Sequence, residues 1–139
     1  MICMIYISSA ALGLSDKQIV TLVKASQKSN EQLGITGILL YSGGNFMQLI
    51  EGRENAVEAL YEKIRQDRRH REVTLLFREK ITQKNFDKWL MGYRNIDNLK
   101  KIDPDLLTPF LDEDLNFASY IKNPHRSLQF LEVFKKIAS

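Results

Sequence analysis

The chain has 139 residues, of which 44% are hydrophobic and 27% charged, a composition typical of a globular protein with a single core. Twenty Lys and Arg residues against 17 Asp and Glu give a net charge of only +3, too small to indicate direct nucleic-acid binding without a clustered basic patch. No apolar run approaches the roughly 20 residues that span a membrane, and the apolar N-terminus lacks the basic start of a signal peptide.

The sequence has few residues that could form disulfides or bind metal ions. Cys3 is the only cysteine, so no internal disulfide can form, and two histidines leave little material for a metal site. We therefore expect a cytoplasmic protein without a metal ion and without membrane contact.

The first predicted elements are a buried strand and a helix. Residues 2–8, ICMIYIS, are apolar on both alternating faces, which predicts a central strand covered on both sides. Ser15 and Gln18 fit a capping box, so a helix should begin there, run to about Leu33 and end at Gly34.

A hairpin and three further elements follow in chain order. Residues 34–52 read as two strands joined by the turn at Ser42, Gly43 and Gly44. The pattern then predicts a second helix at roughly 54–68, a fourth strand at 72–81 and a fifth strand at 89–96.

The order β-α-β-β-α-β-β predicts an α+β, ferredoxin-like sandwich with a five-stranded mixed sheet and two helices on one face. Residues 1–96 would form this core, and residues 97–139 a C-terminal helical extension that covers the other face. In this topology we expect the first and third strands to be parallel neighbours in the middle of the sheet. Tyr6 and Gln48 would then lie on adjacent central strands.

Two prolines predict helix starts in the extension, at Asp103-Pro104 and Asn123-Pro124. The last helix has an apolar surface wider than one stripe, which suits both contact with the sheet and contact with a partner. Its apolar residues are Leu128, Phe130, Leu131, Val133, Phe134 and Ile137.

Polar residues continue the apolar stripes of both core helices. The stripe of the first helix runs through Leu22 into Ser26 and Asn30, and that of the second helix runs into Asp67, with Lys63 beside it. Either these helix ends reach solvent, where cations at a C-terminus are favoured by the helix dipole, or they line a binding site.

Tyr6 and Gln48 are polar groups in apolar strands. A buried hydroxyl or amide left without a partner costs about 1–3 kcal/mol, so both side chains need hydrogen bonds. One interpretation is a purely structural bond between Tyr6 and Gln48. The other is that both serve a ligand with donors and acceptors along one edge, lying between the two helices.

Six segments, in order along residues 4–94, resemble the BLUF domains, which sense blue light with FAD. Each segment is a weak motif alone, and their order and spacing make the resemblance specific. They are IYIS with Tyr6, SQKSN with Asn30, GITGILLY, FMQLIEG with Gln48, DRRH at 67–70, and WLM with Trp89 and Met91.

The resemblance implies a role for each matching residue. Tyr6 would donate an electron and a proton to the photoexcited flavin, and Gln48 would bridge the Tyr6 hydroxyl and the N5/O4 edge of the flavin. Trp89 and Met91 would belong to the segment that rearranges when the signal passes outward. The remaining cofactor-binding residues would be Leu22 and Ile64 on the two ring faces, Ser26, Ser29 and Asn30 near the O4/N3 edge, and Lys63, Asp67, Arg69 and His70 toward the other edge and the phosphate side.

Two positions depart from the family pattern. Ser29 stands where relatives usually carry Asn or His, which puts that flavin contact in doubt. Leu90 stands between Trp89 and Met91 where Ser is frequent, so the local hydrogen bonding of that strand would differ. Neither position touches Tyr6 or Gln48.

The implied function is a photoreceptor and not an enzyme: light rearranges the amide of Gln48 and shifts the flavin absorption to the red. The residues after Asn95 are too few for an effector enzyme, so the output would pass to a downstream protein, response-regulator-like or transcriptional, or through a homo-oligomer. Two other readings stay open. One is a small flavin-dependent oxidoreductase, although no phosphate loop or GxGxxG motif is present, and the other is a flavin-free ferredoxin-like ligand-binding or interaction module.

Overall fold

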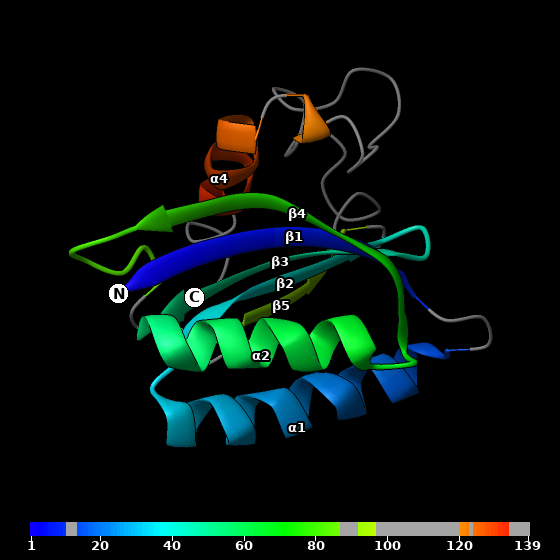
Figure 1. The fold of residues 1–139 in the computed structure, drawn as a ribbon. Helices are drawn as coiled ribbons and strands as arrows, with labels where there is room; N and C mark the ends of the chain where they lie inside the picture. Colours follow the sequence, from blue (N-terminus) through cyan, green and yellow to red (C-terminus); the bar gives the residue numbers. More distant parts are fainter. Residues whose placement is uncertain (11–13, 87–91, 97–119, 123, 134–139) are drawn as a thin grey trace.

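A computed structural model describes residues 1–10, 14–86, 92–96, 120–122 and 124–133 (Figure 1). Five strands form one sheet in the order β4-β1-β3-β2-β5. The strands are β1 Ile2–Ala10, β2 Thr36–Ser42, β3 Asn45–Gly52, β4 His70–Lys80 and β5 Gly92–Asn95. Helices α1 (Asp16–Leu33) and α2 (Glu54–Gln66) lie on one face of the sheet, and α4 (Pro124–Val133) lies on the other. The predicted ferredoxin-like α+β architecture is confirmed.

The direction of β3 corrects one prediction. β1 and β3 are central neighbours, but they pair antiparallel, with Tyr6 directly opposite Gln48. The crossover through α1 returns the chain so that β2 runs in the same direction as β1, and the hairpin then reverses β3. The sheet is mixed because β5 pairs with β2 in parallel.

The predicted hairpin is confirmed, with β2 and β3 joined at Gly43 and Gly44. Both glycines have positive φ, 54° and 82°, as a tight hairpin turn requires. The turn fixes the register in which Leu39 faces Gln48 and Thr36 faces Glu51.

Helix α1 has the predicted ends. Ser15 and Gln18 form the capping box, and Gly34 ends the helix in the left-handed region with its N–H bonded to the carbonyls of Asn30 and Glu31.

Helix α2 ends at Gln66, two residues before the predicted end. Asp67 is extended, and its carboxylate accepts the backbone N–H of Arg69 at 2.9 Å, which competes with another helical turn. The chain then enters β4 at His70, two residues earlier than predicted. This early end turns Asp67, Arg69 and His70 toward the space beside the helices.

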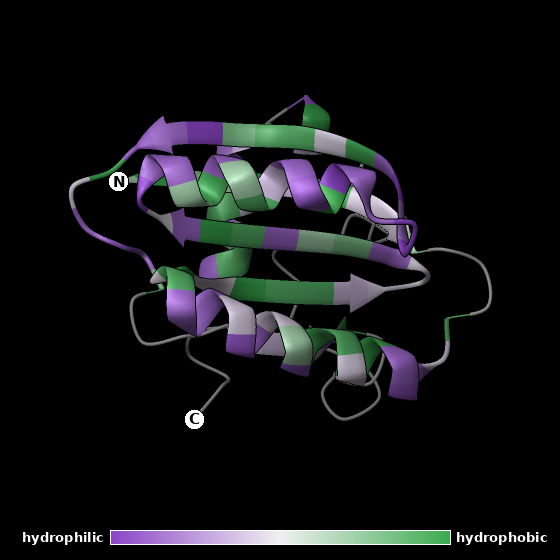
Figure 2. Ribbon diagram, turned by 60° about the horizontal axis from the view of Figure 1, so that its bottom comes forward, coloured by the Kyte–Doolittle hydropathy of each residue, from purple (hydrophilic) through white to green (hydrophobic). Residues whose placement is uncertain are grey.

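Each face of the sheet has its own apolar core. Between α1 and α2, Figure 2 shows hydrophobic residues along the central strands. Ile19 and Val23 of α1 and Val57 of α2 pack on this face, as the helical stripes predict. On the opposite face, Phe130 and Leu131 of α4 are fully buried against the sheet, which confirms that α4 covers it.

Several sequence predictions fall outside the described residues. They concern Trp89 and Met91, the helix start at Asp103, Asn123 as an N-cap, and the apolar residues Phe134 and Ile137.

Candidate functional site

A cavity of about 200 Å³ lies between α1, α2 and the central strands. All ten residues predicted to bind a cofactor line it, although they come from α1, β3, α2, the turn after α2 and the first residue of β4. The ten are Leu22, Ser26, Ser29, Asn30, Gln48, Lys63, Ile64, Asp67, Arg69 and His70.

Three further lining residues, Ala25, Leu39 and Leu60, were not predicted. Ala25 follows Leu22 by three residues, and Leu60 belongs to the apolar stripe of α2, so helical spacing offered a signal for both. Leu39 reaches the cavity because it is paired with Gln48, and that register is not visible in the sequence.

Gln48 separates Tyr6 from the cavity. The Tyr6 hydroxyl donates a hydrogen bond to Oε1 of Gln48, while the Tyr6 side chain is completely buried and does not line the cavity. Burial raises the pKa of the Tyr6 hydroxyl far above its ordinary value, and the neighbouring Tyr61 and Asp67 add to this effect. The hydroxyl is therefore a protonated donor throughout the physiological range of pH.

Asn30 gives the clearest indication that the cavity binds a ligand. Its side chain is 1% exposed and lines the cavity, yet neither its Oδ1 nor its Nδ2 has a hydrogen-bond partner in the described structure. Buried polar groups without partners are rare because each costs about 1–3 kcal/mol. An amide orphaned at both atoms fits a ligand edge that offers one donor next to one acceptor, which is the pattern of a flavin ring edge.

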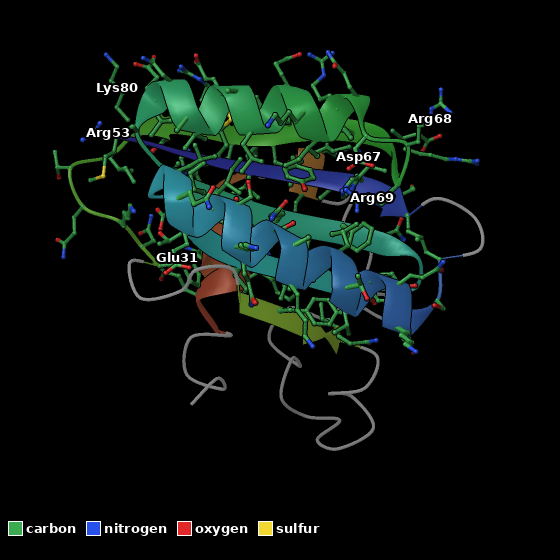
Figure 3. The ribbon with its side chains drawn as sticks, turned by 90° about the horizontal axis from the view of Figure 1, so that it is seen from below. Glu31, Arg53, Asp67, Arg68, Arg69 and Lys80 are labelled. Atoms are coloured by element: carbon green, nitrogen blue, oxygen red, sulfur yellow. The ribbon has the colours of Figure 1, made fainter. Side chains whose placement is uncertain are left out.

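The rim of the cavity near the end of α2 is charged. Figure 3 shows Arg69 beside Asp67 on the side of the cavity, with the exposed Arg68 at the outside of the molecule. Nε and Nη2 of Arg69 donate to the Asp67 carboxylate at 3.0 and 2.6 Å. The hydrogen bonds from Arg69 hold the pKa of Asp67 below its ordinary value, so the carboxylate is ionised. With Lys63 nearby, this rim can bind the polar tail of a cofactor.

His70 closes the cavity at the start of β4. Its Nδ1 lies 2.9 Å from the hydroxyl of Ser8, and its ring lies 5.1 Å from that of Phe46 and 6.2 Å from that of Tyr6, centroid to centroid. Burial lowers the pKa of His70, while Asp67 acts in the opposite direction. The imidazole is therefore neutral at pH 7, with one ring nitrogen engaged by Ser8. The roles of Ser8 and Phe46 in holding His70 were missed from the sequence.

The described residues contain no group of three or more His, Cys, Asp or Glu side chains that could hold a metal ion. None of the helices they form is long and apolar enough to cross a membrane.

The chain was compared with known families and proteins. The family model of the BLUF domain, described as sensors of blue light using FAD, matches residues 1–92. The photoactivated adenylate cyclase subunit alpha of Euglena gracilis is 40% identical over 84 residues, which are 60% of this chain and 8% of that protein. The blue light- and temperature-regulated antirepressor BluF of Escherichia coli is 31% identical over 118 residues, 85% of this chain and 28% of that protein.

A solved structure extends the comparison to the fold. The dark state of BlrB, a BLUF protein, aligns with a TM-score of 0.71 and 35% identity, over 91% of this chain and 93% of that one. The match thus covers nearly all of one solved chain, whereas the chain spans less than a third of either curated relative.

Proposed function

The chain belongs to the BLUF family of flavin-binding blue-light sensors, and from this premise we propose that it is a photoreceptor that holds FAD non-covalently in the cavity between α1 and α2. The observation that carries the proposal is Asn30, whose two amide atoms are buried at the cavity without partners. A flavin ring edge supplies the donor and the acceptor that this amide lacks.

The residues that line the cavity suggest which part of the cofactor each of them contacts. Leu22 of α1 and Ile64 of α2 provide apolar contacts for a planar ring, and Gln48 and Asn30 provide hydrogen bonds. At about 200 Å³ the cavity is smaller than the 300–1,000 Å³ typical of sites that enclose a whole drug-sized ligand. We therefore assign the ring to the cavity and the polar tail to the rim formed by Lys63 and Arg69, with Ser26, Ser29, Asp67 and His70 as further contacts of the cofactor.

A bound flavin, once excited by blue light, supplies an electron acceptor. Tyr6 would give up the electron, and its hydroxyl proton would leave through Gln48 along the hydrogen bond that already joins them. The Gln48 amide then rotates or changes tautomer and presents a different hydrogen-bonding group to the cavity. Both the electron and the proton would return to Tyr6 after the Gln48 amide has rearranged, so no net oxidation or reduction remains. Because an amide both donates and accepts, two networks of similar energy are available, and the dark arrangement returns thermally.

The test is Gln48→Leu in the full chain reconstituted with FAD. Leucine keeps the volume but offers no donor or acceptor, so the variant should bind flavin without a reversible light-induced red shift. Gln66→Leu, on the exposed last residue of α2, is the matched control and should keep the shift. A shift that persists in Gln48→Leu contradicts the mechanism.

The same spectra separate the other two functions. A flavin that bleaches with NAD(P)H and shows no reversible red shift would indicate an oxidoreductase. A protein that stays colourless after incubation with FAD would indicate a flavin-free module.

For the output we propose that the chain acts as a sensor and not as an enzyme, and signals to a protein effector of the response-regulator-like or transcriptional kind. The support is the Escherichia coli relative, which is named an antirepressor. Trp89 and Met91 would transmit the signal, and a homo-oligomer would present it. The free, buried thiol of Cys3 supports a cytoplasmic location. Size-exclusion chromatography in the dark and in blue light tests the oligomer.

A further inference from the structure

Glu51 is a fully buried carboxylate that the proposed photochemistry does not use. It lies on β3 and points to the face covered by α4, away from the flavin cavity. A buried charge is tolerated only where hydrogen bonds replace its hydration, so its partners identify what it does.

The partners of Glu51 come from the segment between β4 and β5. Its Oε1 accepts the backbone N–H of Phe86, and its Oε2 accepts the side-chain amide of Asn85 at 2.9 Å. Cys3 lies directly opposite on β1, and burial together with the Glu51 carboxylate raises the pKa of its thiol. The ring of Phe86 is 1% exposed and packs in the core of this face. The Glu51 carboxylate and this apolar core together hold the segment at Phe86, six residues before β5 begins.

A second donor is available to the same carboxylate. Thr36 on β2 pairs with Glu51 across the sheet, and its Oγ1 is buried without a hydrogen-bond partner in the described structure. Directly opposite residues lie close enough for their side chains to meet. A turn of the Glu51 side chain toward β2 would exchange its bonds to Phe86 and Asn85 for one to the Thr36 hydroxyl.

We propose that Glu51 is a positioning residue that couples Gln48 to β5. In the dark it holds Asn85 and Phe86, and when Gln48 rearranges, Glu51 turns toward the Thr36 hydroxyl and loosens its hold on the Phe86 N–H. The coupling path is short because Gln48 and Glu51 share β3 and because β2, which carries Thr36, pairs with β5. This inference rests on the proposed function, since Gln48 supplies the change.

The test is amide hydrogen exchange of the full FAD-loaded chain, measured in the dark and under blue light. In the unmodified chain, exchange at Phe86 should be several-fold faster in light. Thr36→Val removes only the unpartnered hydroxyl, so it should keep the flavin red shift and the dark exchange while it abolishes the light-induced change at Phe86. Thr74→Val, on β4, is the matched control and should keep that change.

Glu51→Gln tests the dark arrangement separately. A neutral acceptor binds the Phe86 N–H more weakly than a carboxylate, so dark exchange at Phe86 should rise roughly five- to tenfold. Unchanged dark exchange in Glu51→Gln, or a full light-induced change in Thr36→Val, overturns the proposal. So does a red shift in the unmodified chain with no change at Phe86. The proposed function fails by a different result, the absence of a red shift in the unmodified chain.

Discussion

Gln48 and Glu51 lie three residues apart on β3 and point to opposite faces of the sheet. Gln48 lines the cavity under α1 and α2, whereas Glu51 bonds to the segment that leads to β5 under α4. One strand thus carries both the proposed light-sensitive amide and a carboxylate on the far side. A rearrangement of Gln48 can therefore reach the face covered by α4 through β3 alone, without displacement of a helix.

Tyr6→Phe should abolish the reversible red shift and leave FAD bound. The variant removes the hydroxyl that donates to Gln48, and Tyr6 does not line the cavity. The lost hydrogen bond should lower the free energy of unfolding by about 1 kcal/mol. Difference absorption spectra and urea unfolding check the two effects. Tyr61→Phe, whose ring lies 5.9 Å from that of Tyr6, is the control and should keep the red shift.

Asn30→Ala should separate ligand binding from stability. Two hydrogen bonds of about 1 kcal/mol each would be lost to the flavin, so FAD affinity should fall about 10- to 100-fold. The flavin-free protein should lose little stability, because both amide atoms of Asn30 are buried without partners and their removal ends that cost. Fluorescence titration and unfolding of the flavin-free chain measure the pair of effects.

The control for Asn30 is Lys28→Ala, an exposed position on the same helix that does not line the cavity. It should change neither quantity. An Asn30→Ala variant with unchanged FAD affinity would show that the orphaned amide serves another purpose.

Local features of the fold could be predicted, because their causes lie within a few residues. The capping box of Ser15 and the two-glycine turn are examples. The end of α2 was predicted two residues late because the Asp67 carboxylate captures the Arg69 N–H, a competition that helical periodicity does not show. The predicted direction of β3 was wrong because the hairpin after β2 reverses the chain, so β3 runs antiparallel to β1.

The site residues likewise fall into those that the sequence predicted and those that it did not. Polar interruptions of apolar stripes identified Ser26, Asn30 and Asp67, with Lys63 beside them, as candidates. Polar groups in apolar strands identified Tyr6 and Gln48, and the resemblance to a family supplied the remaining residues. Sequence pattern left the purpose of the Tyr6–Gln48 bond open. The partners of Glu51 are 34 and 35 residues away in the chain, so no local pattern predicts them.

Gly37→Ala should prevent stable folding, because a Cβ at this position would lie 1.9 Å from the carbonyl oxygen of Leu49 on β3. Relieving this overlap requires the two strands to separate, so we expect a loss of more than about 3 kcal/mol of unfolding free energy. Gly34→Ala is the comparison: no atom lies within 4 Å, but φ is 68°, so the cost should be only about 1–2 kcal/mol. Urea unfolding ranks the two variants, and equal losses would contradict the argument.

His70 should make the stability of the chain depend on pH. Burial lowers its pKa in the folded state, whereas the unfolded chain has the ordinary value of about 6.5. Between these two values the unfolded chain binds more protons, so the contribution of His70 is complete above about pH 6.5 and is lost as the pH falls through the folded pKa. Asp67 raises and Arg69 lowers the pKa of His70, and the lowered pKa of Asp67 adds a loss of stability only below about pH 4.

Unfolding free energies at pH 7.5 and 5.0 should therefore differ more in the unmodified chain than in His70→Gln. His125→Gln, which changes a histidine exposed on α4, should leave the difference in place. Equal pH dependence in the unmodified chain and His70→Gln would mean that the imidazole is not held neutral by its surroundings.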